Sequence, residues 1–487
     1  MARKTSGTEV TGPYPHGGPL RSSDAFAWRM EGDPLLRSTV VSVLVLDQMP
    51  EWSALAARVE HLTRVVPVLR ERIRTDLLGL GSPRFTAVPD LDLGHHLRRV
   101  GAPDPGGLRT LLELARVDGE EAFDPARPLW RITLVEGVHV DPAAPGEPAG
   151  RAALVIKLHH SLADGLGALQ IAVHLFDADR QPAGEPEADP RLRRPVLTLP
   201  TVVSDVIEDT EDAARTLLAI PRVVTQATWS SIRHPGRTLA TAASVARFVA
   251  PVNRTLSPVM TRRRLGWRYG ALDVALRDLR GAARAGGGTV NDAFLAAVTG
   301  GLDRYQGRHG NRPPELRVTL PVSLRRDGDE EGGNRLTLIR FPVPVRDPDP
   351  ASRMREIGKR VRAWRREPAL GLAEPIAAAL NVLPRRYLGS LLKHVDFLAS
   401  NVAGFPTPIY LAGARVLRQY PFGPTIGAAL NVTLMSYCDR CWIGVTTDTG
   451  AIPDHDALLE CLRESFQEVC ALASGEQCPT PAWDAAK

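Results

Sequence analysis

Two adjacent histidines stand out in the stretch KLHHSLADGLGAL, residues 157–169. His159 and His160 end an apolar run, and Asp164 and Gly165 follow close behind them. An imidazole titrates near neutral pH, so a histidine in a cleft can take a proton from a hydroxyl or a thiol. This pattern indicates a general base held at the end of a strand.

Neighbouring residues of a strand point to opposite faces of the sheet. Only one of the two histidines can therefore face a given cleft, and a metal site is not favoured because its ligands must converge. Asp164 can cap the following helix or orient an imidazole, and Gly165 permits close backbone approach at the turn. The plainer alternative is two ordinary loop histidines beside an aspartate helix cap. No serine nucleophile elbow accompanies the pair, which favours direct transfer between two bound substrates.

The elements around the histidines predict a mixed α/β chain in two similar halves. An apolar strand over residues 151–160 delivers the histidines, and a helix over residues 165–177 follows. Residues 177–195 are rich in proline and charge, which is typical of a linker. Further strands are expected over residues 38–47, 83–88, 129–138, 316–325, 335–345, 397–402, 429–436 and 442–447. Further helices are expected over residues 51–73, 106–117, 201–250, 289–305 (with a capping box from Thr289 to Asp292), 350–364, 370–394 and 454–473.

The pair Cys438 and Cys441 invites a zinc or redox interpretation, but no second Cys-x-x-Cys follows it. The pair lies between two β-rich runs separated by a polar Asp-Arg turn, which predicts a hairpin with the cysteines flanking the turn. We therefore expect no bound metal and no cofactor.

Composition limits the class of protein. The 487-residue chain is 44% hydrophobic and 24% charged, as in a globular protein of two or three domains. Its net charge of +5 comes mainly from dispersed arginines, and aromatic residues are only 5%, so nucleic acid is not an expected partner. No apolar run is long enough to span a bilayer, and the N-terminus lacks the apolar core of a secretory signal. We expect a cytoplasmic protein.

At this point the sequence resembles a known family. HHSLADG, residues 159–165, matches the H-H-x-x-x-D-G motif of the chloramphenicol acetyltransferase-like acyltransferases. RPLWRITLVEG, residues 127–137, resembles the Pro-Leu-Trp motif of the bacterial wax ester synthase/diacylglycerol acyltransferases, at Pro128, Leu129 and Trp130. TVNDAFLAAVTGGL, residues 289–302, is similar to their Asn-Asp helix, at Asn291 and Asp292. Similar blocks also occur at residues 20–31, 320–325 and 400–416, so the resemblance covers roughly residues 18–472 in the family's order.

The resemblance implies two chloramphenicol acetyltransferase-like domains, each a mixed sheet flanked by helices. We place the first at residues 1–178, a Pro-rich and helical linker at 179–260, and the second at 261–487. A tunnel between the domains would admit acyl-CoA from one side and an alcohol from the other. His160 would be the general base and His159 a supporting residue. Asp164 would be structural and paired to an arginine, for which Arg325 is one candidate.

The resemblance also assigns roles to the other motifs. Trp130, by itself an ordinary core aromatic, would lie near the tunnel wall. Asn291, by itself a polar residue of a first helical turn, would support the site through hydrogen bonds. The family's usual Asn-Val-Pro-Gly-Pro is altered here, with Ala403 and Phe405 in place of the prolines, and residues 123–126 read FDPA where Leu-Asp-Arg is frequent. These departures leave the catalytic interpretation intact and put the usual lipid substrates in doubt.

The implied activity is transfer of a long-chain acyl group from acyl-CoA to a fatty alcohol or a diacylglycerol, without a covalent acyl-enzyme. Insoluble substrates would place the protein peripherally on a membrane or lipid droplet. One alternative is a related enzyme of specialised metabolism, with a different acceptor or a carrier-bound donor. A second is a non-catalytic lipid-binding homologue, against which the intact His160 and Asp164 argue. The acceptor, the acyl length and the oligomeric state stay open.

Overall fold

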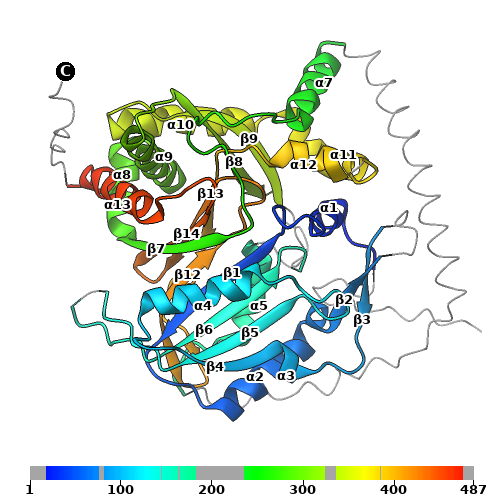
Figure 1. Cartoon of the computed structure of the whole chain (residues 1–487), viewed down its shortest axis with the longest axis vertical. Helices are drawn as coiled ribbons and strands as arrows, with labels where there is room; N and C mark the ends of the chain where they lie inside the picture. The colour runs from blue at the N-terminus through cyan, green and yellow to red at the C-terminus, as the bar shows by residue number, and fades with distance from the viewer. Residues whose placement is uncertain are drawn as a thin grey trace, which may run out of the picture.

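The computed structural model describes residues 18–75, 82–143, 145–162, 165–181, 235–323, 336–383 and 385–474. Within them lie two six-stranded sheets and one small hairpin, with helices packed against the sheets (Figure 1). This confirms the predicted mixed α/β class. Most of the expected linker, including residues 182–234, falls outside the described residues, so the domain limits at 178 and 260 stay predictions.

The first sheet carries the histidine motif and has the strand order β11-β12-β1-β6-β5-β4. Its strands are β1 (Thr39–Leu46), β4 (Leu97–Gly101), β5 (Trp130–Glu136), β6 (Ala152–His159), β11 (Tyr410–Leu411) and β12 (Ala414–Phe422). Its helices are α2 (Trp52–Val65), α3 (Leu93–His96), α4 (Leu108–Glu120) and α5 (Gly165–Leu175), and β2 (Glu71–Arg74) with β3 (Arg84–Ala87) form the small hairpin. Strands β1, β5 and β6 are almost wholly buried, and most of their residues are apolar.

The second sheet has the order β7-β14-β13-β10-β8-β9. Its strands are β7 (Trp267–Ala275), β8 (Glu315–Ser323), β9 (Leu336–Pro344), β10 (Phe397–Ala403), β13 (Leu430–Tyr437) and β14 (Arg440–Asp448). The helices of this half are α7 (Pro235–Val249), α8 (Leu276–Ala285), α9 (Val290–Arg308), α10 (Pro350–Arg365), α11 (Ala373–Asn381), α12 (Arg385–Leu392) and α13 (His455–Ala471). Figure 1 shows α9, α10 and α13 gathered together, whereas α11 and α12 lie toward α1 (Ser22–Met30).

Strand β12 comes late in the chain but belongs to the first sheet. It pairs antiparallel with β1, with Val41 opposite Phe422 and Leu46 opposite Val416, and an irregularity in register follows Val45. The core under the first sheet accordingly includes residues from this late segment, such as Tyr420. The first sheet is therefore built from strands of both halves of the chain.

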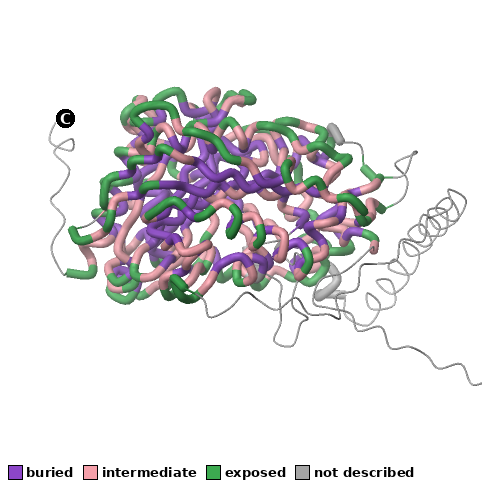
Figure 2. The backbone as a smooth tube through the Cα atoms, turned by 90° about the horizontal axis from the view of Figure 1, so that it is seen from below, coloured by how far each residue is buried: buried purple, intermediate pink, exposed green. Residues whose placement is uncertain are grey.

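Buried residues form two main cores, one for each sheet. Figure 2 shows the buried segments running through the middle of the molecule, with exposed segments around its margin. The first core is built on β1, β5 and β6, and the second on α9 and strands β8, β10, β13 and β14. Helix α9 is buried along almost its whole length, and its expected capping box is present: Thr289 and Asp292 bond to each other's backbone.

Three expected elements differ from the structure. The helix expected over residues 51–73 ends at Val65, because Pro67 cannot continue it, and a 3₁₀ turn and β2 follow. The helix expected over residues 370–394 is divided into a 3₁₀ turn, α11 and α12. In the late hairpin the turn is Cys438-Asp439 rather than Asp-Arg. Arg440 belongs to β14, where it pairs with Tyr437 and ion-pairs with Asp273 of β7.

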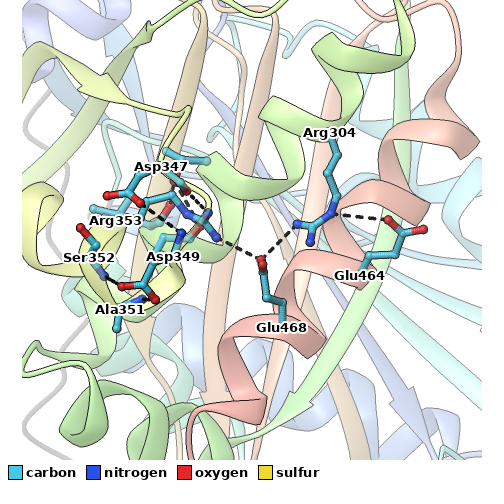
Figure 3. A network of polar contacts seen from close by, with 11 residues as sticks. Arg304, Asp347, Asp349, Ala351, Ser352, Arg353, Glu464 and Glu468 are labelled. Carbon is cyan, nitrogen blue, oxygen red and sulfur yellow. Dashed lines mark hydrogen bonds and ion pairs between the residues drawn. The ribbon is translucent and has the colours of Figure 1, made fainter. Parts of the chain in front are cut away.

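A buried ion pair joins three helices of the second half (Figure 3). Arg353 of α10 is only 3% exposed, and its guanidinium donates to Glu468 of α13 at 3.2 Å and to the carbonyl oxygens of Ala296 and Asp347. Glu468 also accepts from Arg304 of α9 at 3.2 Å. Burial lowers the pKa of Arg353, and the Glu468 carboxylate opposes that shift. The carboxylate therefore offsets the cost of burying the charged guanidinium of Arg353 in the core.

Replacing Glu468 with alanine should lower the free energy of unfolding by about 3–5 kcal/mol, because Arg353 would keep its charge without its carboxylate partner. Urea denaturation measures this loss. Glu464→Ala is the matched control: Glu464 lies one turn away on α13, is 47% exposed and, among the described residues, forms ion pairs with Arg304 and Arg308. Its loss should cost less than about 1 kcal/mol. Equal effects of the two substitutions would contradict the role given to Arg353.

Candidate active site

The last residue of β6 and the residue after it are the two histidines of the motif. His159 lies opposite Thr39 of β1, and its N–H donates to the carbonyl oxygen of Leu129 at 3.0 Å. The N–H of His160 donates to the carbonyl oxygen of Ser38 at 2.9 Å. His159 is completely buried, whereas His160 is partly exposed and lines a cavity. Of the two imidazoles, His160 is thus the one that a cavity ligand can reach.

The imidazole of His159 is fixed by hydrogen bonds at both nitrogens. Ser161 donates its N–H to Nδ1 at 3.2 Å and places its Oγ 2.6 Å from the same atom. Because Nδ1 accepts a backbone N–H, the proton of the neutral ring is on Nε2, which donates to Glu31 Oε2 at 3.2 Å. The rings of Trp28 and Phe123 meet the imidazole edge-on. His159 is therefore held rigidly beneath the cavity.

Glu31 supports both histidines. Its Oε2 atom accepts from His159 Nε2 and also from the N–H of Ser38, each at 3.2 Å. The carbonyl oxygen of Ser38 in turn accepts from the N–H of His160. Arg37 Nε lies 3.8 Å from the other carboxylate oxygen. Glu31, which follows α1, thus connects the N-terminal block to both histidines of the motif.

The cavity beside His160 has a volume of about 190 Å³ and walls from both halves of the chain. Helices α1, α11 and α12 and strands β8 and β9 supply most of its lining. The apolar members are Phe26, Ala27, Met30, Phe248, Leu338, Trp364, Ala373, Ile376, Ala377, Leu380, Leu391, Leu392 and Ile426. The polar ones are Ser23, Ser38, His160, Thr319, Thr337, Arg340 and Glu374. A largely apolar cavity with few polar groups suits an apolar chain with one polar end.

Lys157 is a buried amine on the same strand as the histidines. It donates to the carbonyl oxygens of Asp118 and Glu121 at 2.6 and 2.7 Å, at the C-terminal end of α4. Its ammonium also lies over the ring of Phe123. Burial lowers the pKa of Lys157 to about 8. These contacts give Lys157 a structural role, since it binds the last carbonyls of α4 to β6.

The Pro-Leu-Trp motif forms the start of β5, beside β6. Leu129 is fully buried and supplies the carbonyl that accepts from His159. Trp130 donates its indole N–H to Leu69 O at 2.8 Å and stacks on His96, whose pKa burial lowers to about 4. Pro128 is buried beside them. All three lie in the core of the first half, and none of them lines the described part of the cavity.

The remaining predicted site residues lie elsewhere or outside the described residues. Asp164 and its candidate partner Arg325 are not described, and Gly165 is the first residue of α5. Asn291 is half-buried in the first turn of α9, and Asp292 accepts from the N–H and hydroxyl of Thr289 at 2.9 Å. Neither Asn291 nor Asp292 is among the cavity residues, so any support they give His160 stays a prediction.

Comparison with known proteins adds a second line of evidence. The family described as the wax ester synthase/diacylglycerol acyltransferase catalytic domain matches residues 20–294, and the family's C-terminal domain matches residues 332–469. The chain belongs to the wax ester synthase/diacylglycerol acyltransferase family. It is an acyltransferase of that type, as the motifs predicted.

Relatives match the acyltransferase over nearly all of its length. A Mycobacterium tuberculosis protein, provisionally named a diacylglycerol O-acyltransferase, is 34% identical over 93% of this chain and 91% of its own. The wax ester synthase/diacylglycerol acyltransferase of Marinobacter aquaeolei has a similar fold, with a TM-score of 0.60 at 22% identity over 94% of this chain and all of the other. The starter condensation domain of rhizomide synthetase, solved with C8-CoA, gives a TM-score of 0.58 at 12% identity over 94% of this chain and 95% of its own.

Two features are absent from the described residues: a membrane-spanning helix and a metal-binding cluster. No helix among them is both long and apolar enough to cross a membrane. They also contain no group of three or more His, Cys, Asp or Glu side chains arranged to hold a metal ion. Cys438 and Cys441 are free cysteines of the late hairpin. The expected lack of a metal or a cofactor stays a prediction.

Two of the departures from the family pattern, Ala403 and Phe405, lie at and just after the end of β10. The ring of Phe405 meets that of Phe176 edge-on at 6.2 Å, and its carbonyl accepts from the N–H of Cys438 at 2.8 Å. Neither Ala403 nor Phe405 is among the described residues that line the cavity. Phe405 instead contacts Phe176, which follows α5, and the late hairpin, and its effect on the substrates stays a prediction.

Sequence reasoning missed several residues around the motif. Glu31 and Ser38 hold the histidines, and Thr319 and Arg340 line the cavity, yet none of them was singled out. A signal existed for Glu31, because it ends the N-terminal block at residues 20–31 that resembles the family. Thr319 and Arg340 had no such signal, since they reach the cavity only through the pairing of β8 with β9.

Replacing Glu31 with alanine should lower the free energy of unfolding by about 2–4 kcal/mol, because His159 Nε2 and the N–H of Ser38 would lose their common acceptor. Glu31→Gln is the conservative control. Its amide oxygen can accept both hydrogen bonds, so it should recover most of the stability. Thermal and urea unfolding of the unchanged protein and the two variants measure the order of their stabilities. If the glutamine variant is as unstable as the alanine variant, the charge of Glu31 matters rather than its hydrogen bonds.

Proposed function

We propose that the protein transfers a long-chain acyl group from acyl-CoA to the hydroxyl of a hydrophobic alcohol, either a fatty alcohol or a diacylglycerol. The observation that carries the proposal is His160, which sits at the end of β6 and lines a largely apolar cavity walled by both halves. Family membership supplies the reaction class. The apolar lining supports an acyl chain or an alkyl alcohol as the occupant.

In the proposed reaction His160 is the general base. The imidazole takes the proton of the acceptor hydroxyl as the oxygen attacks the thioester carbonyl. The tetrahedral intermediate collapses, the C–S bond breaks, and the thiolate of CoA leaves. The imidazolium returns the proton to that thiolate, so His160 ends neutral and the products are an ester and free CoA. The buried His159 supports this step by fixing the backbone from which His160 projects.

Three observations support the substrate classes. The rhizomide starter condensation domain, whose fold is similar, was solved with C8-CoA. The chain also carries a net charge of +5, which favours an anionic donor such as CoA. Mycobacterial relatives are named for diacylglycerol acylation, and the Marinobacter structure for wax ester synthesis as well. The proposal therefore includes both a fatty alcohol and a diacylglycerol as acceptors.

We also propose that the protein works at a lipid surface. Exposed apolar side chains gather at and beside α11 and α12: Leu372, Val382, Leu383 and Tyr387, of which Val382 is 60% exposed. The residues Ala373, Ile376, Ala377 and Leu380 of α11 line the cavity. An apolar rim beside an apolar cavity would let an insoluble substrate enter without crossing water.

Changing His160 to alanine should reduce the rate of acyl transfer by about 10²–10⁴, the usual effect of losing a general base. The fold should persist, because the hydrogen bond from the N–H of His160 to the carbonyl oxygen of Ser38 uses backbone atoms that the substitution keeps. Single-turnover measurement of CoA release gives the rate, and circular dichroism checks the fold. His96→Ala is a control for the general loss of a histidine, since His96 lies in the core beside Trp130. A folded His160 variant with near wild-type turnover would show that another group is the base.

The purified protein should form an ester when it is incubated with palmitoyl-CoA and either hexadecanol or a diacylglycerol. Free CoA and lipid product should rise together, which distinguishes transfer from simple thioester hydrolysis. CoA release without ester would mean that the acceptor is of another class. That result would favour the alternative of a condensing enzyme of specialised metabolism, which the fold similarity to condensation domains supports.

A further inference from the structure

One wall of the cavity carries a polar pair that the proposed acyl transfer does not use. Thr319 of β8 and Arg340 of β9 lie directly opposite each other in the antiparallel ladder. Residues paired in this way project from the same face of a sheet, and both line the cavity. The pair therefore places a hydroxyl and a guanidinium side by side on an otherwise apolar wall.

Arg340 has hydrogen-bond partners but no counter-ion among the described residues. Its two terminal nitrogens donate to the carbonyl oxygens of Leu391 and Ala250. Burial, together with the neighbouring charge of Arg317, lowers the pKa of Arg340 to about 10. Carbonyl dipoles orient the guanidinium without neutralising it, so the cavity wall keeps a net positive charge.

Thr319 contributes an unsatisfied hydroxyl. The residue is only 3% exposed, and its Oγ1 atom has no hydrogen-bond partner among the described residues. Leaving a buried hydroxyl without a partner costs about 1–3 kcal/mol. A buried hydroxyl beside an uncompensated guanidinium is therefore a ready donor pair for an acceptor that enters the cavity.

Glu374 is the acidic residue among the described cavity residues, and it does not neutralise Arg340. Its carboxylate accepts from the N–H of Ser22 at 3.1 Å, on the side of α1. No ion pair joins it to Arg340, and it does not contribute to the shift in the pKa of Arg340. The positive end of the cavity thus stays available to an anionic ligand.

We propose that Thr319 and Arg340 bind the carboxylate of a free long-chain fatty acid, whose alkyl chain occupies the apolar part of the cavity. A carboxylate accepts both from a guanidinium and from a hydroxyl, and a charge-assisted bond of this kind is stronger than one between neutral groups. The apolar walls, among them Phe248, Leu338 and Trp364, select a ligand that is a chain rather than a small anion.

This site would give the protein a third ligand besides the two substrates of the proposed reaction. Because the same cavity reaches His160, a bound fatty acid would occupy space that a substrate chain needs. The free acid would then inhibit transfer when it accumulates. Binding itself does not require the transfer reaction, so the two proposals can fail separately.

The test compares equilibrium binding of palmitate, hexadecanol and methyl palmitate to the full-length protein by isothermal titration calorimetry. We expect palmitate to bind at least about tenfold more tightly than the two uncharged ligands, which corresponds to one charge-assisted bond. Equal affinities for the three ligands would overturn the proposal. Preference for lysophosphatidate over palmitate would also overturn it, because the site would then select a phosphate head.

Two variants locate the site. Thr319→Val removes a hydroxyl for which the described part of the chain offers no partner, so it should fold normally and weaken palmitate binding by about threefold to tenfold. Arg340→Gln should abolish the preference for palmitate while hexadecanol binding stays unchanged. Arg317→Gln is the matched control, since Arg317 lies two residues along β8 from Thr319 and is not among the cavity residues. A preference for palmitate that survives in both Thr319→Val and Arg340→Gln would overturn the assignment.

Discussion

The position of β1 between β6 and β12 is the constraint on which the rest of the molecule depends. On one side its first residue, Thr39, lies opposite His159, and on the other side Val41 lies opposite Phe422. One strand therefore fixes the end of β6, where His160 emerges, and also draws a late segment of the chain into the first sheet. The cavity between the halves takes its walls from this arrangement, because β8, β9, α11 and α12 are carried by the half that β12 anchors.

Buried polar groups in this protein bind elements to one another rather than stabilise any one of them. Glu31 connects the end of α1 to His159 and Ser38, and Lys157 connects β6 to the end of α4. Arg353 and Glu468 connect α10 to α13. Each group is costly to bury alone and is satisfied only when two elements are in place, so these contacts specify how the elements pack. Arg340 and Thr319 differ from these groups. Among the described residues the guanidinium has no counter-ion and the hydroxyl has no hydrogen-bond partner, and both residues line the cavity.

The sequence predicted the local features well, because they follow from short-range rules. The strand that ends at the histidines, the capping box at Thr289 and the late hairpin each rest on a pattern a few residues long. The prediction failed where a residue far away in the sequence determines the local structure. Arg440 was taken as part of a turn, but β7 holds it in a strand through Asp273, which lies far away in the sequence. The membership of β12 in the first sheet, the role of Glu31 and the Thr319–Arg340 pair likewise depend on contacts that no local pattern encodes.

The late arrival of β12 has a consequence for synthesis of the protein on the ribosome. Domains generally fold as units from the N-terminus as the chain emerges, but here β1 keeps one unpaired edge until residues 414–422 have been made. An open edge of an apolar strand is a template for pairing with another chain. For most of translation the nascent polypeptide must therefore shield the edge that runs from Val41 to Leu46, and a chain released before Phe422 would expose it permanently. Truncated products should aggregate rather than persist as a folded first half.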